Sequence, residues 1–209
     1  MGVSTLLPIP TGPGRSTTHQ QLADLEQRII TLGAKKVGLW SVHCTTYHST
    51  SLLTTVHVNY PLHVLLSSED ESSSYAITGS GVCLSGDRDL SLIIAQLKTF
   101  YTKRLSITIE AKGPRYQLGD FLIKPGVVSM GPSAHSNILE VEYMPSCVAT
   151  QCWGLLKQML LQIMDHSNVA EMHRDPPQGH TDGVLYTRAH TMSQYIGVFS
   201  RIWGTKASR

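Results

Sequence analysis

The sequence predicts an α+β fold in which an antiparallel sheet, curled or closed into a β-barrel, packs against several flanking helices. Apolar and polar residues alternate over many short stretches separated by Gly, Ser and Asn, which is typical of strands joined by hairpins. Other stretches repeat apolar residues at helical spacing. The strands follow one another without the regular helix–strand alternation of a parallel sheet. We therefore expect one barrel-like domain over residues 17–209.

The first half of the chain predicts one helix followed by consecutive strands. Residues 1–16, rich in Pro, Gly, Ser and Thr, are expected to be a flexible N-terminal segment. Leu22, Leu25 and Ile29 then recur at helical spacing, and Gly33 is placed to end that helix. Strands are expected at 37–44, 52–58 and 61–66, and then in the stretches "YAIT" and "GVCLS".

The second half predicts three more helices. One spans about 87–101, with an apolar face made of Leu90, Ile93, Ile94, Leu97 and Tyr101. Strands follow in "SITIEAKG", "YQLGDFLIK", "GVVSM" and "NILEVEYM", and a helix begins near residue 150. Residues 165–188 lack periodicity and contain paired prolines, which predicts a long loop before the last helix at about 190–203.

Composition narrows the class of protein. Charged residues make up 15% of the chain, below the roughly 25% of an ordinary soluble domain, which indicates a subunit whose surface is covered by a partner. A net charge of +2 is too small for direct nucleic-acid binding. The four cysteines are expected to be reduced thiols of an intracellular protein. No apolar run approaches the roughly 18 residues that a membrane span requires.

The stretch "GPSAHSN" at 131–137 contains Ser133 and His135, a candidate nucleophile and base. However, its residues are those of a turn, it lacks the Gly-x-Ser-x-Gly elbow, and no local acid is present to orient the imidazole. A hairpin turn is therefore the favoured interpretation.

Glu140 and Glu142 alternate with apolar residues, so on a strand both carboxylates face the same side. The pattern is similar to the Glu-x-Glu-x-Lys strand of triphosphate tunnel enzymes, and the alternative function is a metal-dependent tripolyphosphate or phosphohydrolase of that type. Met144 stands where the lysine belongs, and few charged residues are left to line a tunnel. A solvated face of the sheet is favoured over this alternative.

The other candidate sites are weaker, and we expect no cofactor and no metal. Neither His43 with His48 nor His173 with His180 has a zinc-ligand spacing. "HRD" at 173–175 lacks the remaining kinase motifs, and "GSGVCLSG" at 79–86 lacks the ending of a phosphate-binding loop and indicates a tight turn.

The last helix carries an aromatic stripe of Tyr195, Phe199 and Trp203. Such a stripe packs on the chain's own core more often than not, which is the favoured interpretation. A docking face for a partner is the alternative, since aromatic residues anchor many interfaces.

A combination of short elements is dense between residues 113 and 156. It contains Arg115-Tyr116-Gln117, Asp120-Phe121-Leu122, Lys124, Gly126, Met130-Gly131-Pro132-Ser133-Ala134, Val141-Glu142-Tyr143, and Cys152-Trp153 before a leucine pair. This combination resembles the family of subunit twenty of the Mediator complex, with weaker similarity at 46–48, at 60–62 and in the second helix.

The resemblance implies a non-enzymatic subunit of the Mediator head module, a nuclear coactivator of RNA polymerase II transcription, built as an antiparallel β-barrel decorated by helices. It also implies pairing with subunit eighteen, tethering of that pair by the carboxy-terminal segment of subunit eight, and a link to the TATA-binding protein. No catalytic residue, cofactor or metal is implied.

Overall fold

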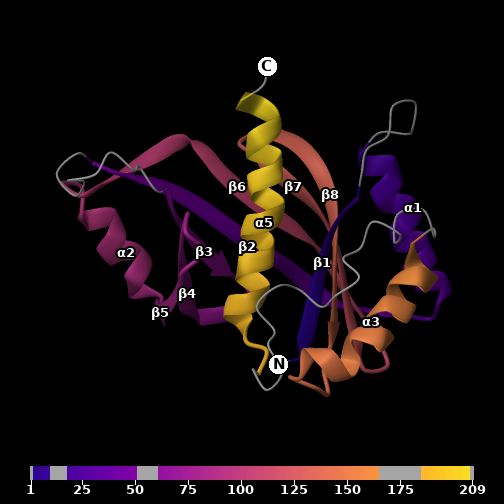
Figure 1. Cartoon of the computed structure of the whole chain (residues 1–209). Helices are drawn as coiled ribbons and strands as arrows, with labels where there is room; N and C mark the ends of the chain where they lie inside the picture. Colours follow the sequence, from indigo (N-terminus) through magenta and orange to yellow (C-terminus); the bar gives the residue numbers. More distant parts are fainter. Residues whose placement is uncertain (1, 10–17, 51–60, 165–184, 208–209) are drawn as a thin grey trace.

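The part of the chain that the structure describes, residues 2–9, 18–50, 61–164 and 185–207, folds around one antiparallel sheet (Figure 1). In this computed structural model the described strands form an eight-stranded sheet in the order β1-β8-β7-β6-β2-β3-β4-β5. The strands are β1 (Val3–Ile9), β2 (Lys35–Ser49), β3 (Pro61–Ser67), β4 (Asp70–Thr78), β5 (Cys83–Asp87), β6 (Tyr101–Leu118), β7 (Phe121–Met130) and β8 (Ser133–Tyr143). The predicted α+β class is confirmed.

Tight turns join several neighbouring strands. Gly119 lies between β6 and β7, and Gly131 lies between β7 and β8. Their φ angles of +56° and +60° fall in the left-handed region, which glycine enters without the clash that a Cβ would cause. Ser133, two residues after Gly131, opens β8 opposite Met130. The hairpin predicted at "GPSAHS" is therefore confirmed.

The sheet is curled and is not closed within the described residues. β1 and β5 stand at the two ends of the strand order, and no described pairing joins them. A closed barrel needs its edge strands to be hydrogen-bonded to each other, so the curled sheet, rather than the closed barrel, describes these residues.

Helices cover both faces of the sheet. α1 (Thr18–Thr31) and α3 (Ala149–Ile163) pack on one face, where Ile29 and Leu156 meet Leu139 of β8. α5 (Arg188–Ala207) crosses the other face, where Tyr195 packs in one cluster with Ile138 of β8 (Figure 1). Since successive strand residues point to opposite faces, β8 is buried on both sides.

α2 (Asp89–Gln96) packs on the opposite end of the sheet from β1, against β4, β5 and β6. It is shorter than the predicted helix at 87–101, because the backbone turns after Leu97 and β6 begins at Tyr101. Only Ile94 of this helix is fully buried, whereas Ile93 is 54% exposed and Leu97 is 38% exposed. The predicted apolar face is therefore only partly covered.

The expectation that residues 1–16 form a flexible segment is wrong for Val3–Ile9. These residues form β1, which pairs with β8 from Val3 opposite Tyr143 to Ile9 opposite Asn137. β1 is an edge strand, where Pro8 is tolerated because only one side of the strand needs donors. The prolines and glycines of residues 1–16 as a whole hid the strand pattern of Val3–Ile9.

Two predicted segments lie outside the described residues: the strand at 52–58 and most of the loop at 165–188. Of that loop, Leu185–Thr187 are irregular and Arg188 already begins α5.

All four cysteines are free thiols. Within the described part of the chain, no helix is both long enough and apolar enough to cross a membrane.

Candidate functional site

A lysine and two glutamates meet on the face of the sheet that α5 covers. Lys124 of β7 stands directly opposite Glu140 of β8, and Glu142 follows two residues later on the same face. The Lys124 Nζ lies 3.0 Å from Glu140 Oε1 and 3.2 Å from Glu142 Oε2. The three residues are 1%, 3% and 8% exposed. They form the centre of a buried polar site.

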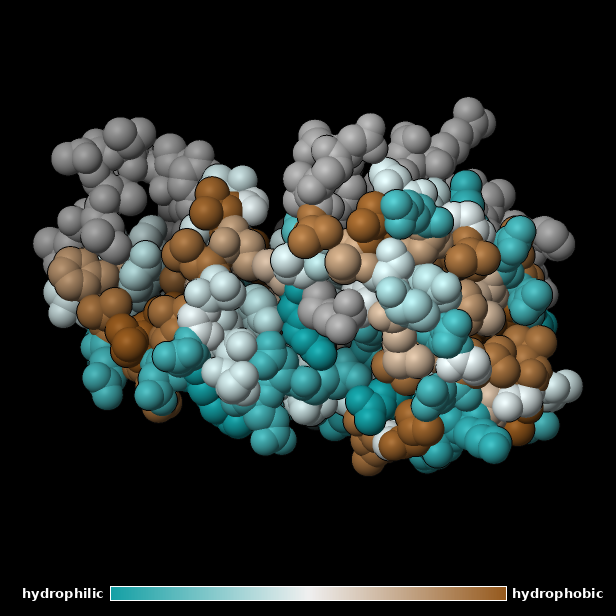
Figure 2. Space-filling view, turned by 90° about the horizontal axis from the view of Figure 1, so that it is seen from below, coloured by the Kyte–Doolittle hydropathy of each residue, from teal (hydrophilic) through white to brown (hydrophobic). Residues whose placement is uncertain are grey.

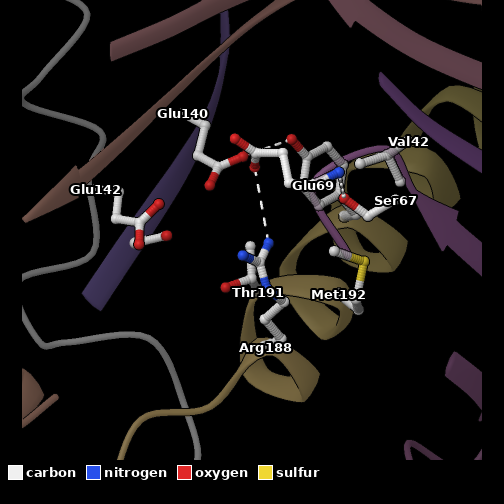
Figure 3. A pocket seen from close by; sticks show the side chains of 10 residues that line it. Val42, Ser67, Glu69, Glu140, Glu142, Arg188, Thr191 and Met192 are labelled. Atoms are coloured by element: carbon white, nitrogen blue, oxygen red, sulfur yellow. Dashed lines mark hydrogen bonds and ion pairs between the residues drawn. The ribbon is translucent and has the colours of Figure 1, made fainter. Parts of the chain in front are cut away.

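A third carboxylate and two guanidinium groups extend this centre. Glu69, in the turn between β3 and β4, places its Oε2 2.6 Å from Lys124 Nζ and its Oε1 3.0 Å from Arg115 Nη1. Arg188, at the start of α5, points its Nη1 toward Glu69 Oε2 at 3.7 Å (Figure 3). We call this set the buried ion cluster: Glu69, Glu140, Glu142, Lys124, Arg115 and Arg188. Its three carboxylates and three cations balance in formal charge.

The pKa values of the cluster favour the charged forms. Burial by itself lowers the pKa of Lys124, but the negative charges of Glu140, Glu69 and Glu142 outweigh burial and hold that pKa above its ordinary value. Burial likewise raises the pKa of Glu69, but Lys124, Arg115 and Arg188 together lower it below its ordinary value. The cluster is therefore a set of ion pairs at neutral pH.

The same cluster fastens α5 to the sheet. The Tyr195 hydroxyl of α5 donates a hydrogen bond of 2.6 Å to Glu140 Oε2. Burial, followed by the charge of Glu140, raises the pKa of Tyr195 well above its ordinary value, so the hydroxyl stays protonated as a donor. Gln194 Nε2 donates to the Ser4 carbonyl at 3.0 Å, and the Leu6 N–H donates to Gln194 Oε1 at 2.9 Å. These bonds tie α5 to both β8 and β1.

The enclosed space in this site is too small for a substrate. The cavity between the cluster and α5 has a volume of about 10 Å³, which is room for about one water molecule. Each carboxylate of the cluster already contacts a cation. Among the described residues, no group of three or more His, Cys, Asp or Glu side chains is placed to hold a metal ion. The arrangement is suited to holding the fold together, and it gives the phosphohydrolase alternative no support.

The expectation of a solvated face for Glu140 and Glu142 is wrong. The two carboxylates do share one face, as predicted, but α5 covers that face. Of the residues that sequence reasoning missed, Lys124 carries a signal, because it interrupts the apolar run "FLIKPGVV" at 121–128, and a charged side chain buried in a strand needs a partner. Glu69 carries no such signal, because it lies among other acidic and Ser residues of a turn.

The remaining predicted candidates are not brought together into a site. Ser133 is exposed at the start of β8, and His135 is half-buried on the same strand. His43 lies 3.5 Å from Glu110 on the exposed part of the sheet, whereas His173 and His180 lie outside the described residues. Residues 79–82 of the stretch "GSGVCLSG" form the turn between β4 and β5, as predicted, and its remaining residues belong to β5.

The aromatic stripe of α5 lies mostly in the core. Tyr195 and Phe199 are each 0% exposed, with ring centroids 5.7 Å apart, and the ring of Trp40 packs beside Tyr195 at 6.1 Å. Packing on the chain's own core therefore describes these two residues in the isolated chain. The side chain of Trp203 lies outside the described residues, and the interface role of the stripe stays a prediction.

Comparison with known proteins identifies the family. Residues 1–200 match the family described as "TATA-binding related factor (TRF) of subunit 20 of Mediator complex". The chain is 35% identical over 205 residues to Mediator of RNA polymerase II transcription subunit 20 of Homo sapiens, a match covering 97% of this chain and 94% of that protein. It is 32% identical over 213 residues to the Gallus gallus protein of the same name, with the same coverage of 97% and 94%. The Aedes aegypti protein is 35% identical over 163 residues, covering 77% of this chain and 72% of that protein. The chain therefore belongs to the subunit 20 family of the Mediator complex, non-enzymatic components of the RNA polymerase II transcription machinery.

Proposed function

We propose that this chain acts in the nucleus as a protein-binding scaffold of the Mediator head module and pairs there with subunit eighteen. The observation that carries the proposal is family membership over 97% of the chain combined with a site whose charged groups are enclosed and mutually paired. An enclosed, charge-balanced cluster stiffens the fold and offers no group to a substrate. The function then lies in the surface of the chain.

The surface supports such a role in two ways. Charged residues are only 15% of the chain, so the exposed surface carries fewer charges than that of an ordinary soluble domain. Large apolar side chains are also exposed, among them Leu39 at 73% and Leu92 at 59%. A partner subunit that covers these side chains removes apolar area from water, which favours association.

The pairing is tested by co-expressing the full chain with the subunit-eighteen homologue of the same organism and separating the products by size-exclusion chromatography. We expect a single peak that contains both chains in equal amounts and that persists on dilution to about micromolar concentration, since subunits of stable assemblies bind at least this tightly. Two separate peaks at that concentration contradict the pairing.

Subunit eight and the TATA-binding protein complete the proposed set of partners. Adding the carboxy-terminal segment of subunit eight to the purified pair should move that segment into the peak of the pair. Immobilised pair should retain the TATA-binding protein, and a column carrying the subunit-eighteen homologue alone is the matched control. Equal retention on both columns contradicts a contribution of this chain.

A further inference from the structure

Several large apolar side chains are exposed at the end of the sheet where β5 and α2 lie. Figure 2 shows hydrophobic residues gathered at the end of the molecule where α2 and β5 lie. We call this the α2–β5 surface, and its exposed apolar residues are Val82 (56%), Leu84 (57%), Leu92 (59%), Ile93 (54%), Leu97 (38%) and Phe100 (41%). In soluble proteins, a contiguous exposed apolar surface of this kind usually marks an interaction site.

The exposure follows from the composition of α2. An amphipathic surface helix places polar residues on its outer side, but here the adjacent residues Leu92 and Ile93 both point outward, while Ile94 fills the inner side. β5 is the last strand of the described sheet, so no described strand pairs with its outer edge. Among the residues that the structure describes, nothing covers this helix face and strand edge, which lie at the same end of the sheet.

Charges at the two ends of α2 differ. Lys98 is exposed just beyond the carboxyl end of the helix, next to Leu97 in the chain, and Lys103 is exposed near the start of β6, three residues after Phe100. At the amino end, Asp87 and Asp89 flank Arg88, whose guanidinium donates to the Glu71 carbonyl. The segment that follows the carboxyl end of α2 therefore carries two exposed cations as well as two exposed apolar side chains, and a complementary partner carries carboxylates there.

We propose that the α2–β5 surface docks another Mediator subunit through an amphipathic segment whose apolar residues are flanked by Asp or Glu side chains. The apolar residues of that segment cover Leu92, Ile93 and Leu84. Its carboxylates face Lys98 and Lys103 and set its direction along the helix. This inference rests on the proposed function, because the partner is a member of the same complex.

The test expresses the full chain with an affinity tag in cells of its source organism and measures, by quantitative mass spectrometry, how much of the other Mediator subunits is captured with it. The double variant Leu92→Glu, Ile93→Glu changes two exposed side chains and should keep the wild-type circular dichroism spectrum and melting temperature. We expect its recovery of Mediator subunits to fall about tenfold or more, as for the centre of an interface. The control variant Leu155→Glu, Leu161→Glu alters two partly exposed leucines of α3 and should keep recovery within about twofold of wild type.

Charge reversal separates the two parts of the proposal. Lys98→Glu, Lys103→Glu should also lower recovery and should make the remaining association less sensitive to added salt. Unchanged recovery with this variant overturns the acidic flank, and wild-type recovery with Leu92→Glu, Ile93→Glu overturns the docking surface. If the purified wild-type chain is a dimer that this last variant turns into a monomer, the surface binds a second copy and the proposal is wrong. If the wild-type chain itself recovers no Mediator subunit, the proposed function fails, and this inference fails with it.

Discussion

Replacing Lys124 by methionine removes the central cation of the buried ion cluster and leaves most of its side-chain volume in place. The Nζ of Lys124 contacts Glu69, Glu140 and Glu142 at 2.6, 3.0 and 3.2 Å, and the side chain is 1% exposed. After the substitution, Glu142 keeps the hydrogen bond from the Gly2 N–H, at 2.9 Å, but has no other cation within the described cluster. The variant therefore contains buried carboxylates without sufficient positive charge.

The expected loss in the free energy of unfolding is about 3–5 kcal/mol at pH 7, the range observed when one partner of a buried ion pair is removed. Urea denaturation of the purified full chain, followed by far-ultraviolet circular dichroism, measures this loss directly. The matched control is Lys112→Met. Lys112 also contacts a glutamate, Glu110, at 2.7 Å, but its side chain is 61% exposed, so that variant should lose less than about 1 kcal/mol.

The pH dependence supplies a second, independent readout. In the wild type, the pKa of Glu69 is lowered in the folded state, so its ionisation adds stability above the ordinary value of 4.5, and this stability is lost as the pH falls through the folded-state pKa. In Lys124→Met, the strongest cause that lowers the pKa of Glu69 is gone, so burial prevails and raises that pKa, and Glu69 takes up a proton more readily in the folded state than in the unfolded state. The stability of the variant should then increase as the pH is lowered from 7 toward 5.

The reasoning is refuted if Lys124→Met loses no more stability than Lys112→Met and the two proteins share the same pH dependence. A double-mutant cycle with Glu140→Gln refines the result. Removing that carboxylate from the Lys124→Met background should recover part of the lost stability, with a coupling energy of about 1–3 kcal/mol.

Three further predictions concern single side chains. Burial, with a contribution from the neighbouring His48, lowers the pKa of His63 from 6.5 to about 4. As the pH falls, the unfolded state therefore binds the proton before the folded state does, and the free energy of unfolding should decrease by about 2–3 kcal/mol between pH 6.5 and 4. His63→Gln should abolish that slope in urea titrations across this range. Gly126→Ala should lower the stability of the protein by about 1–3 kcal/mol, because the added Cβ would lie 2.6 Å from a ring atom of Trp40. Gly154→Ala in α3 adds a Cβ that meets nothing within 4 Å and should raise the stability by about 0.5–1 kcal/mol. Melting temperatures of the two variants that shift in the same direction contradict this pair of predictions. Tyr195→Phe removes the donor to Glu140 and should cost about 1.5–3 kcal/mol in chemical denaturation. A loss below about 0.5 kcal/mol argues against a stabilising role of this hydrogen bond.

Local patterns predicted most of the secondary structure because they follow from the chemistry of neighbouring residues. The apolar spacing of Leu25 and Ile29 predicted α1, and the turn residues Gly131, Pro132 and Ser133 predicted the β7–β8 hairpin. The same reasoning failed for Val3–Ile9, because Pro8 and the proline- and glycine-rich residues around this stretch have the composition of a loop, whereas an edge strand tolerates proline.

The candidate site was predictable only in part. A two-residue period places Glu140 and Glu142 on one face of a strand, but it does not say whether that face meets water or a helix. The two glutamates are buried because α5 covers this face of the sheet, where its Tyr195 contacts Glu140. α5 begins only at Arg188, 48 residues after Glu140. Glu69 and Arg115 join the same cluster from other turns and strands, and no spacing along the chain connects them.

The sequence by itself determined the class of fold, the alternation of the strands, the family, and the absence of a recognisable catalytic motif, because each of these depends on residue types at short separations. Only the tertiary structure decided that the paired glutamates are buried and neutralised, that Tyr195 and Phe199 are core residues, and that Leu92 and Ile93 are left exposed on the α2–β5 surface. The physical reason is that burial and charge pairing depend on which elements cover a given face, and that choice is made by packing among segments far apart in the chain.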